Sequence, residues 1–284
     1  MEWAKTSNQN IAMLLLDFEK AYDRVEWAFI IMMLAAFGFL KEFCQLVQIL
    51  LKDASAQLDI NGSITNAFNL GRSTRQGCHL VPALFVIASD VISYLLRDER
   101  LPPRVKGISL PNKTDLLNIQ FADNAALFLE LNEGNMESLT NKLKIFGEAS
   151  EAKISQSKSI LLGWLENPPD WLSKFGYQWG GPYKQIRYLG IPFSVSPCLK
   201  DMGLWVKSKL DTKLNKRNRH YLSLAGTIQV CQKILSSYSI YHASIWMFSN
   251  YKVNDIQKCI QQFLWSDGRG NKKRHSVMGV VLQG

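Results

Sequence analysis

Long apolar runs and closely spaced cysteines are both missing from this sequence. No apolar run approaches the roughly 18 residues of a membrane-spanning helix, and the N-terminus has neither the basic start nor the apolar centre of a secretory signal. The five cysteines and four histidines show no zinc-ligand spacing. We therefore expect an intracellular protein, nuclear or cytoplasmic, with free thiols and no membrane partner.

Internal repeats and low-complexity tracts are also absent. The chain has 284 residues, 47% of them hydrophobic, which suffices for a sizeable core and two subdomains. Strand and helix patterns alternate to about residue 193, and helical patterns follow. We predict an α+β fold with a first subdomain over 1–193 and a helical second one over 194–284. The expected helices cover 25–37, 43–51, 84–96, 135–146, 199–218, 223–238 and 254–265.

Negative charge is scarce in the C-terminal third. Residues 200–284 hold 14 Lys and Arg against 4 Asp and Glu, a net charge of +10, so the first 199 residues carry −1 of the total of +9. Basic clusters of this kind suit a nucleic-acid backbone bound without sequence preference. The other interpretation, a solvated helix face and a disordered tail, stays open. The candidate nucleic-acid-binding residues are Lys207, Lys209, Lys213, Lys216, Arg217 and Arg219.

Two carboxylates stand where apolar strands end. The buried-strand pattern of 11–16 stops at Asp17, and two apolar runs over 116–121 and 125–129 flank Asp123 like the arms of a hairpin. Phosphoryl transfer by two magnesium ions needs carboxylates on rigid strands that hold the ions roughly 4 Å apart. Each Asp alone is equally typical of an ordinary strand-ending turn.

A second hairpin is predicted at Asn61 and Gly62, a strong two-residue turn signal. Arg75, Gln76 and Gly77 follow it. Gly77 permits a close backbone approach, and Gln76 can hydrogen-bond a nucleotide or the backbone. From the tripeptide alone, Arg75 fits a solvated loop charge equally well.

Six segments, in order along the chain, resemble the reverse transcriptase domain of LINE-type (non-LTR) retrotransposons, particularly those of plants. Together they run from the first palm motif almost to the C-terminus, so the resemblance covers most of the chain. The segments are 16–27, 75–85, 121–124, 148–159, 187–193 and 263–265.

The resemblance implies a polymerase palm, an antiparallel sheet with packed helices, followed by an α-helical thumb. It implies an RNA-directed DNA polymerase that uses an RNA template, a DNA primer, deoxynucleotides and two Mg²⁺ ions, for which Mn²⁺ can substitute. Asp17 and Asp123 match the metal-binding positions, and Asn124 completes the catalytic turn. Lys158 matches the lysine that protonates departing pyrophosphate. As an isolated residue, it fits a surface charge.

Other positions match the substrate contacts of the family. Tyr22 stands where an aromatic ring lies under the sugar of the incoming nucleotide, although a core aromatic is the alternative. The remaining matches are Phe18, Arg75, Gln76 and Gly77 for nucleotide binding, and Tyr188, Leu189 and Gly190 for the primer grip.

Departures from the family pattern concentrate near the motifs. Asn124 replaces the second Asp of the usual Asp-Asp pair, which keeps an oxygen but loses the charge. One charge pair at about 4 Å is worth roughly 4 kcal/mol, which corresponds to a roughly thousandfold slower reaction. His79, Val81 and Glu151 replace the usual Pro, Ser and Gly.

The first motif also begins close to Met1, so we expect the upstream fingers region to be largely absent. Three hypotheses stay open. The chain is an impaired reverse transcriptase, a non-catalytic nucleic-acid-binding remnant of one, or an unstable fragment without a function.

Overall fold

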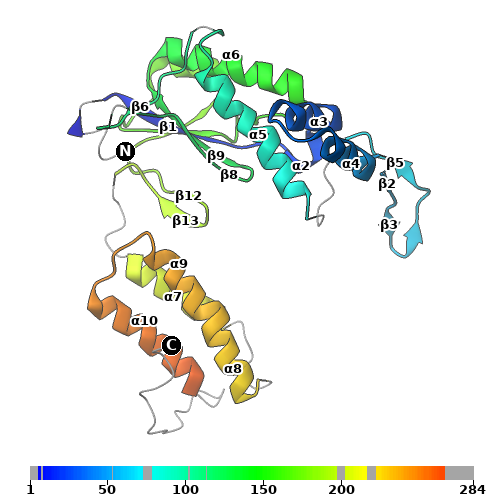
Figure 1. The fold of residues 1–284 in the computed structure, drawn as a ribbon. Coiled ribbons are helices and arrows are strands. Elements are labelled where there is room, and N and C mark those ends of the chain that lie inside the picture. The colour runs from blue at the N-terminus through cyan, green and yellow to red at the C-terminus, as the bar shows by residue number, and fades with distance from the viewer. Residues whose placement is uncertain are drawn as a thin grey trace. The chain divides into compact units, whose positions relative to one another are not determined.

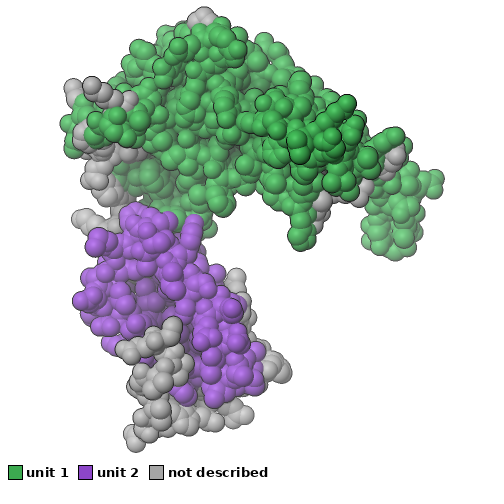
Figure 2. All heavy atoms as spheres, in the orientation of Figure 1, with its two compact units in different colours: residues 1–196 green, residues 197–284 purple. Residues whose placement is uncertain are grey.

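The computed structural model describes residues 6–7, 9–52, 54–72, 79–101, 103–112, 114–196, 202–215 and 222–265. The chain divides into two compact units, 1–196 and 197–284 (Figure 2). Each unit has its own apolar core. Among the described helices, none combines the length and the hydropathy that crossing a bilayer requires.

A five-stranded sheet with the order β11-β10-β1-β9-β8 forms the first unit's centre (Figure 1). The middle strand β1 pairs antiparallel with both β9 and β10, because its run of six apolar residues is buried by neighbours on both sides. The expected antiparallel sheet is confirmed except for the parallel pair β10–β11. The strands are β1 (Ile11–Leu16), β8 (Asn118–Phe121), β9 (Asn124–Glu130), β10 (Ile160–Gly163) and β11 (Gln178–Gly180).

Alternation along β1 gives the sheet two different faces. Leu14 and Leu16 belong to the core that the helices share, whereas Met13 and Leu15 pack with the hairpin of β12 (Ile186–Tyr188) and β13 (Ile191–Phe193). The first face is the helical face and the second is the hairpin face. The helices are α2 (Ala21–Arg24), α3 (Trp27–Ala36), α5 (Val81–Arg97) and α6 (Glu133–Ser150), with a short 3₁₀ helix η1 (Asp170–Phe175).

Gly38 ends α3 as the sequence predicted. Its φ of 84° lies in the left-handed region, and its N–H donates to the carbonyl of Ala35 at 3.0 Å. The following helix α4 (Lys41–Leu51) forms as predicted, and one of its faces packs Cys44 and Val47 into the core of the first unit. Leu46 and Leu50 are 51% and 59% exposed, because α4 packs along α3 and buries only the narrow stripe around Val47.

Short hairpins complete the first unit. The predicted turn at Asn61 and Gly62 is confirmed, since β3 and β4 pair across it and φ is 54° and 87° at its two residues. The short strands are β2 (Ser55–Ala56), β3 (Asp59–Ile60), β4 (Ser63–Ile64), β5 (Phe68–Asn69), β6 (Ile108–Ser109) and β7 (Asp115–Leu116).

The second unit is helical, as predicted. Val206 and Leu210 from α7 pack against Leu235 and Ile260 in a separate core. The stretch 224–243 is continuously helical and longer than the predicted 223–238. The helices are α7 (Met202–Asn215), α8 (Leu224–Val230), the π-helical η3 (Cys231–Ser236), α9 (Ser237–Ala243) and α10 (Asn250–Trp265).

Asn135 ties α6 to the sheet. Its buried amide accepts from the N–H of Lys106 at 2.8 Å and donates to the carbonyls of Lys106 and Glu130, both at 2.9 Å. Asn135→Ala should therefore lower the free energy of unfolding by about 1–3 kcal/mol, because buried backbone groups lose their partners. Urea denaturation measures this change.

The matched control is Asn141→Ala, an exposed position on the same helix, which should change stability by less than about 0.5 kcal/mol. Equal effects at both positions would contradict the anchoring role of Asn135.

Candidate active site

The strand register brings three predicted site residues to one end of the sheet. Leu16 of β1 pairs with Ala125 of β9, so the next step of the register places Asn124 across from Asp17. On the other side, the pairing of Leu15 with Ile160 continues toward Lys158. Asp17, Asn124 and Lys158 line one open hollow of about 310 Å³. This hollow is called the Asp17 hollow below.

Side chains alternate between the two faces of a strand, and this decides whether Asp123 or Asn124 lies on the same face as Asp17. Asp17 continues the series of Met13 and Leu15 on the hairpin face, and Asn124 continues the series of Ala126 on the same face. The neutral amide therefore shares the hollow with Asp17. Asp123 is not among the residues that line it.

Asp123 lies in the two-residue turn between β8 and β9. Phe121 pairs with Asn124 across this turn, and Ala122 has a φ of 52°. The Asn124 side-chain amide donates to Asp123 Oδ1 at 3.3 Å. Burial and then the negative charge of Asp123 raise the pKa of Tyr22, so the Asp123 carboxylate lies close enough to act on that phenol. Asp17 and Asp123 thus stand at the same end of adjacent strands.

Tyr22 and Phe18 rest on the same ring of α5. The Tyr22 and Phe85 centroids are 4.9 Å apart, and Phe18 meets Phe85 edge-on at 6.0 Å. Phe18 is buried at 9% exposure and forms a backbone bridge with Ile154, so its ring is a core element. Tyr22 is only partly buried beside Asp123, which leaves its ring accessible from the site.

The loop before β10 is bonded to the backbone of Asp17. The Asp17 N–H donates to Ser159 Oγ at 3.1 Å, and the Asp17 carbonyl accepts from the N–H of Ser155 at 2.8 Å. Ser159 in turn donates to the Ser155 carbonyl at 2.8 Å. These bonds hold Lys158 beside Asp17. Both serines lie in the motif segment 148–159, but the sequence analysis gave neither of them a role.

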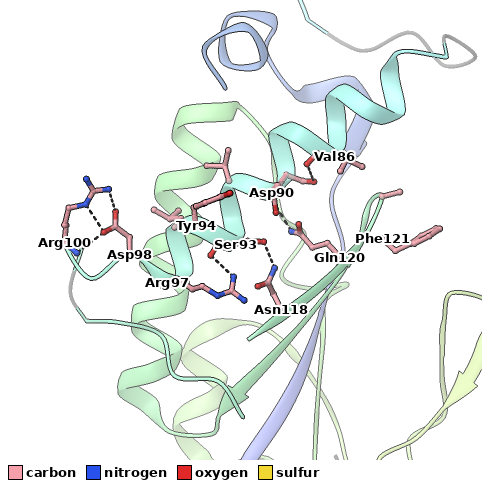
Figure 3. Close-up of a pocket in the computed structure, with 14 residues that line it drawn as sticks. Val86, Asp90, Ser93, Tyr94, Arg97, Asp98, Arg100, Asn118, Gln120 and Phe121 are labelled. Atoms are coloured by element: carbon pink, nitrogen blue, oxygen red, sulfur yellow. Dashed lines mark hydrogen bonds and ion pairs between the residues drawn. The ribbon is translucent and has the colours of Figure 1, made fainter. Parts of the chain in front are cut away.

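The outer strand β8 is fixed to α5 through side-chain amides (Figure 3). Asn118 donates to Ser93 Oγ at 2.6 Å, and Gln120 donates to the Ser89 carbonyl at 3.3 Å. Both amides line a second hollow of about 1150 Å³ between α5 and β8, which reaches Ala122. They position the strand that delivers the Asp123 turn. Their alternate spacing was the signal that sequence reasoning overlooked.

The predicted primer-grip residues form a tight turn between β12 and β13. Leu189 and Gly190 have φ values of 50° and 78°, the pattern of a type I′ hairpin turn. Tyr188 lines the Asp17 hollow. Its hydroxyl is buried and has no hydrogen-bond partner among the described residues, and burial raises its pKa.

The described lysines of α7 lie close to aromatic rings or to α10. Lys209 Nζ lies 5.9 Å from the Trp205 ring centroid, and Lys213 Nζ lies 4.3 Å from that of Tyr238. Burial and then Asp211 raise the pKa of the Cys259 thiol on α10 to about 12, and the nearby charge of Lys207 partly opposes this rise. The predicted residues Arg75, Gln76, Gly77, Lys216, Arg217 and Arg219 lie outside the described residues.

The oxygen ligands at the sheet end suit magnesium. The Asp17 carboxylate makes no hydrogen bond or ion pair with the described residues. Magnesium binds through one or two carboxylates together with water and substrate phosphates, and Asp17 and Asp123 are carboxylates at the same end of the sheet. Within the described ranges, no cluster of three His, Cys, Asp or Glu side chains could hold a metal alone. An ion here would depend on the phosphates of a bound nucleotide.

Known proteins show related sequences. The chain is 28% identical over 272 residues to the "Transposon TX1 uncharacterized 149 kDa protein" of Xenopus laevis, covering 93% of this chain and 20% of that protein. It is 23% identical over 219 residues to the "Retrovirus-related Pol polyprotein from type-1 retrotransposable element R2" of Popillia japonica, covering 73% and 35%. The chain thus spans between a fifth and about a third of these curated relatives.

Solved structures of telomerase from Candida tropicalis are also similar. The apo form has a TM-score of 0.48 and 12% identity over 95% of this chain and 49% of that one. The complex with the TWJ fragment of telomeric RNA has a TM-score of 0.48 and 10% identity over 92% and 44%.

The family described as reverse transcriptase (RNA-dependent DNA polymerase) matches residues 2–193. This range includes the whole five-stranded sheet and every residue that lines the Asp17 hollow. The match covers more than half of the chain. The chain therefore belongs to the reverse transcriptase (RNA-dependent DNA polymerase) family.

Proposed function

We propose that residues 1–193 are the palm and residues 194–284 the thumb of a reverse transcriptase that grips an RNA template and a DNA primer, and that Asn124 impairs its catalysis. The observation that carries this proposal is the register at the sheet end. It puts an amide directly across from Asp17, where a carboxylate is usual in the family.

The residues at the sheet end have separate roles in the proposed reaction. Asp17 and Asp123 would hold the two magnesium ions, which stabilise the attacking primer hydroxyl and the leaving phosphate oxygen when bound. Tyr22, resting on Phe85, supports the sugar of the deoxynucleotide. Lys158 stands in the Asp17 hollow, where it can protonate the departing pyrophosphate.

The amide of Asn124 in place of a carboxylate would weaken the proposed magnesium site without removing Asp17 or Asp123 from it. A charge pair at about 4 Å contributes roughly 4 kcal/mol at an effective dielectric near 20, and about 1.4 kcal/mol corresponds to tenfold in rate. Asn124 lines the same hollow as Asp17, so we take its missing charge to act directly on the proposed metal site. A reaction slower by roughly a thousandfold follows.

The nucleic-acid grip comes from two further regions. Tyr188, Leu189 and Gly190 would hold the primer end beside the Asp17 hollow. Arg75, Gln76 and Gly77 would position the incoming nucleotide. The basic residues of 207–219 would bind backbone phosphates through charge alone. We further propose an intracellular setting, nuclear or cytoplasmic, and an origin in a plant element.

A second candidate function is a nucleic-acid-binding remnant without catalysis. The Asp17 hollow favours it, because Lys158, Lys184 and Arg187 line the hollow together with the single carboxylate of Asp17. Such a surface retains phosphate even when the reaction is lost.

Primer extension tests the first candidate. On a poly-A template with an oligo-dT primer, the natural chain should extend little with either magnesium or manganese. Asn124→Asp should raise the rate by roughly a thousandfold, because it restores the charge opposite Asp17. Product lengths on a denaturing gel give the rates.

The matched control is Asn141→Asp, which makes the same chemical change at an exposed position of α6, outside the Asp17 hollow. It should restore nothing. Robust extension by the natural chain would overturn the proposed impairment, and failure of Asn124→Asp to rescue would favour the remnant.

Salt dependence tests the basic helix α7. The association constant for an RNA–DNA hybrid should fall steeply with salt, because each neutralised phosphate adds roughly 0.7–0.9 to the logarithmic slope. Lys209→Ala combined with Lys213→Ala should reduce the slope by roughly 1.4–1.8. Fluorescence anisotropy at several salt concentrations measures it.

Lys258→Ala is the control for this experiment. Lys258 lies on α10, 3.9 Å from Asp255, so its charge is partly neutralised within the helix. If the association constant of the natural chain did not change with salt concentration, this would count against α7 as a nucleic-acid surface.

A further inference from the structure

Asp17 is held in place through its backbone. Its N–H donates to Ser159 Oγ at 3.1 Å, and its carbonyl accepts from the N–H of Ser155 at 2.8 Å. Both partners belong to the loop before β10. Neither bond uses the carboxylate, so the loop can fix where Asp17 stands while the acid itself faces the Asp17 hollow.

This loop runs alongside the residues that follow β1. Phe18 and Ile154 form an antiparallel bridge, and the N–H of Glu19 donates to the Lys153 carbonyl at 2.8 Å. Lys153 and Glu19 also form an ion pair, with 3.5 Å between Nζ and Oε2. Antiparallel contact therefore continues past the end of β1, with the segment 153–155 as the partner.

A turn at 156–158 separates this segment from β10. The register of β1 with β10 ends at the pair of Leu15 and Ile160, because the N–H of Ser159 turns back to the carbonyl of Ser155 at 2.9 Å. A continuing ladder would offer backbone carbonyls to the N–H groups across from it. For the Asp17 N–H, the acceptor in the described part of the chain is instead the Ser159 hydroxyl.

The Ser159 hydroxyl is buried and has a fixed direction. The residue is 0% exposed. Its Oγ donates to the Ser155 carbonyl at 2.8 Å, which leaves the oxygen lone pairs to accept from Asp17. The Ser159 carbonyl accepts from the N–H of Gln178 at 3.1 Å, so the backbone of this residue is tied to β11 as well.

The same turn carries Lys158. This lysine is exposed, precedes Ser159 directly in the chain, and lines the Asp17 hollow together with Asp17. Lys158 is joined to Ser159 by a peptide bond, and Asp17 is joined to it by a hydrogen bond. A shift of Ser159 would therefore change the distance between the Asp17 carboxylate and the Lys158 ammonium group.

We infer that Ser159 is a positioning residue, which fixes the backbone of Asp17 relative to Lys158. The inference rests on the proposed function for the roles of Asp17 and Lys158 in the reaction, whereas the hydrogen bond does not depend on that function. Ser159 acts only through these two neighbours. Without its hydroxyl, the Asp17 N–H would lose its acceptor, and the turn would lose one of its links to β1.

Hydrogen exchange followed by mass spectrometry tests the bond in the natural chain. Ser159→Ala should speed exchange in the peptide that contains the Asp17 amide roughly fivefold, because this amide loses its hydrogen bond. Ser159→Thr keeps a hydroxyl and should leave the exchange within about twofold. Melting temperatures report separately what the added methyl group of threonine costs in a buried place.

Ser138→Ala is the matched control. Ser138 is also buried, and its hydroxyl also donates to the carbonyl four residues earlier, that of Gly134 at 2.7 Å. It lies on α6, outside the Asp17 hollow. This variant should leave the exchange at Asp17 within about twofold of the natural chain, since the change is local.

A double-mutant cycle tests the role in the reaction, in an Asn124→Asp background that restores measurable primer extension. Ser159→Ala should lower kcat about tenfold when Lys158 is present, and about threefold or less when it is combined with Lys158→Ala, because the effect that passes through Lys158 is then already lost. A purely structural loss, as expected for Ser138→Ala, would be the same in both backgrounds.

Three outcomes would overturn the inference. Ser159→Ala could leave the exchange at Asp17 as slow as Ser138→Ala does, its effect on kcat could be equal with and without Lys158, or Ser159→Thr could match Ser159→Ala while keeping the natural melting temperature. An Asn124→Asp variant that extends no primer would contradict the proposed function instead. The exchange measurement still decides whether Ser159 holds Asp17, so the two failures are distinguishable.

Discussion

The antiparallel pairing of β1 with its two neighbours is the constraint on which the site depends. It joins residues more than a hundred positions apart, and it fixes which side chains meet at the sheet end. Leu16 against Ala125 and Leu15 against Ile160 are apolar pairs inside the sheet. A shift by one residue would send the Asp17 side chain to the helical face. The packing of buried apolar residues therefore fixes where the polar side chains lie at the sheet end.

Much of this arrangement is readable from the sequence. Apolar runs of strand length that stop at Asp17 and flank Asp123 predicted which residues leave the sheet together. The pattern did not reveal that Asn124, rather than Asp123, shares a face with Asp17, because this depends on the two-residue length of the turn. The pattern also did not reveal that part of the apolar face of α4 is exposed to solvent. Helical periodicity identifies an apolar face but not whether a neighbour covers it.

Left-handed backbone occurs at non-glycine residues within the motif segments. Ala122, Leu189 and Glu151 are non-glycine residues with φ values of 52°, 50° and 59°. Each such residue costs about 1–2 kcal/mol relative to ordinary backbone. Glu151 ends α6 where the family usually has Gly, so the left-handed geometry persists although the favoured residue is gone. Ala122 and Leu189 sit in the turns that present Asp123 and the primer-grip segment. The strand pairs that flank each turn must therefore stabilise a backbone conformation that Ala122 and Leu189 would not otherwise favour.

Fold and chemistry rest on different residues, and this explains how one can persist while the other weakens. The side chains that fix the register, such as Leu14 and Leu127, are fully buried, so their replacement would open cavities in the core. Asn124 and Asp17 are exposed at the strand ends and make few contacts. Exchange of a carboxylate for an amide there removes a charge without disturbing packing. Under the proposed function, Asn124 would therefore slow the reaction while the sheet that positions the site stays intact.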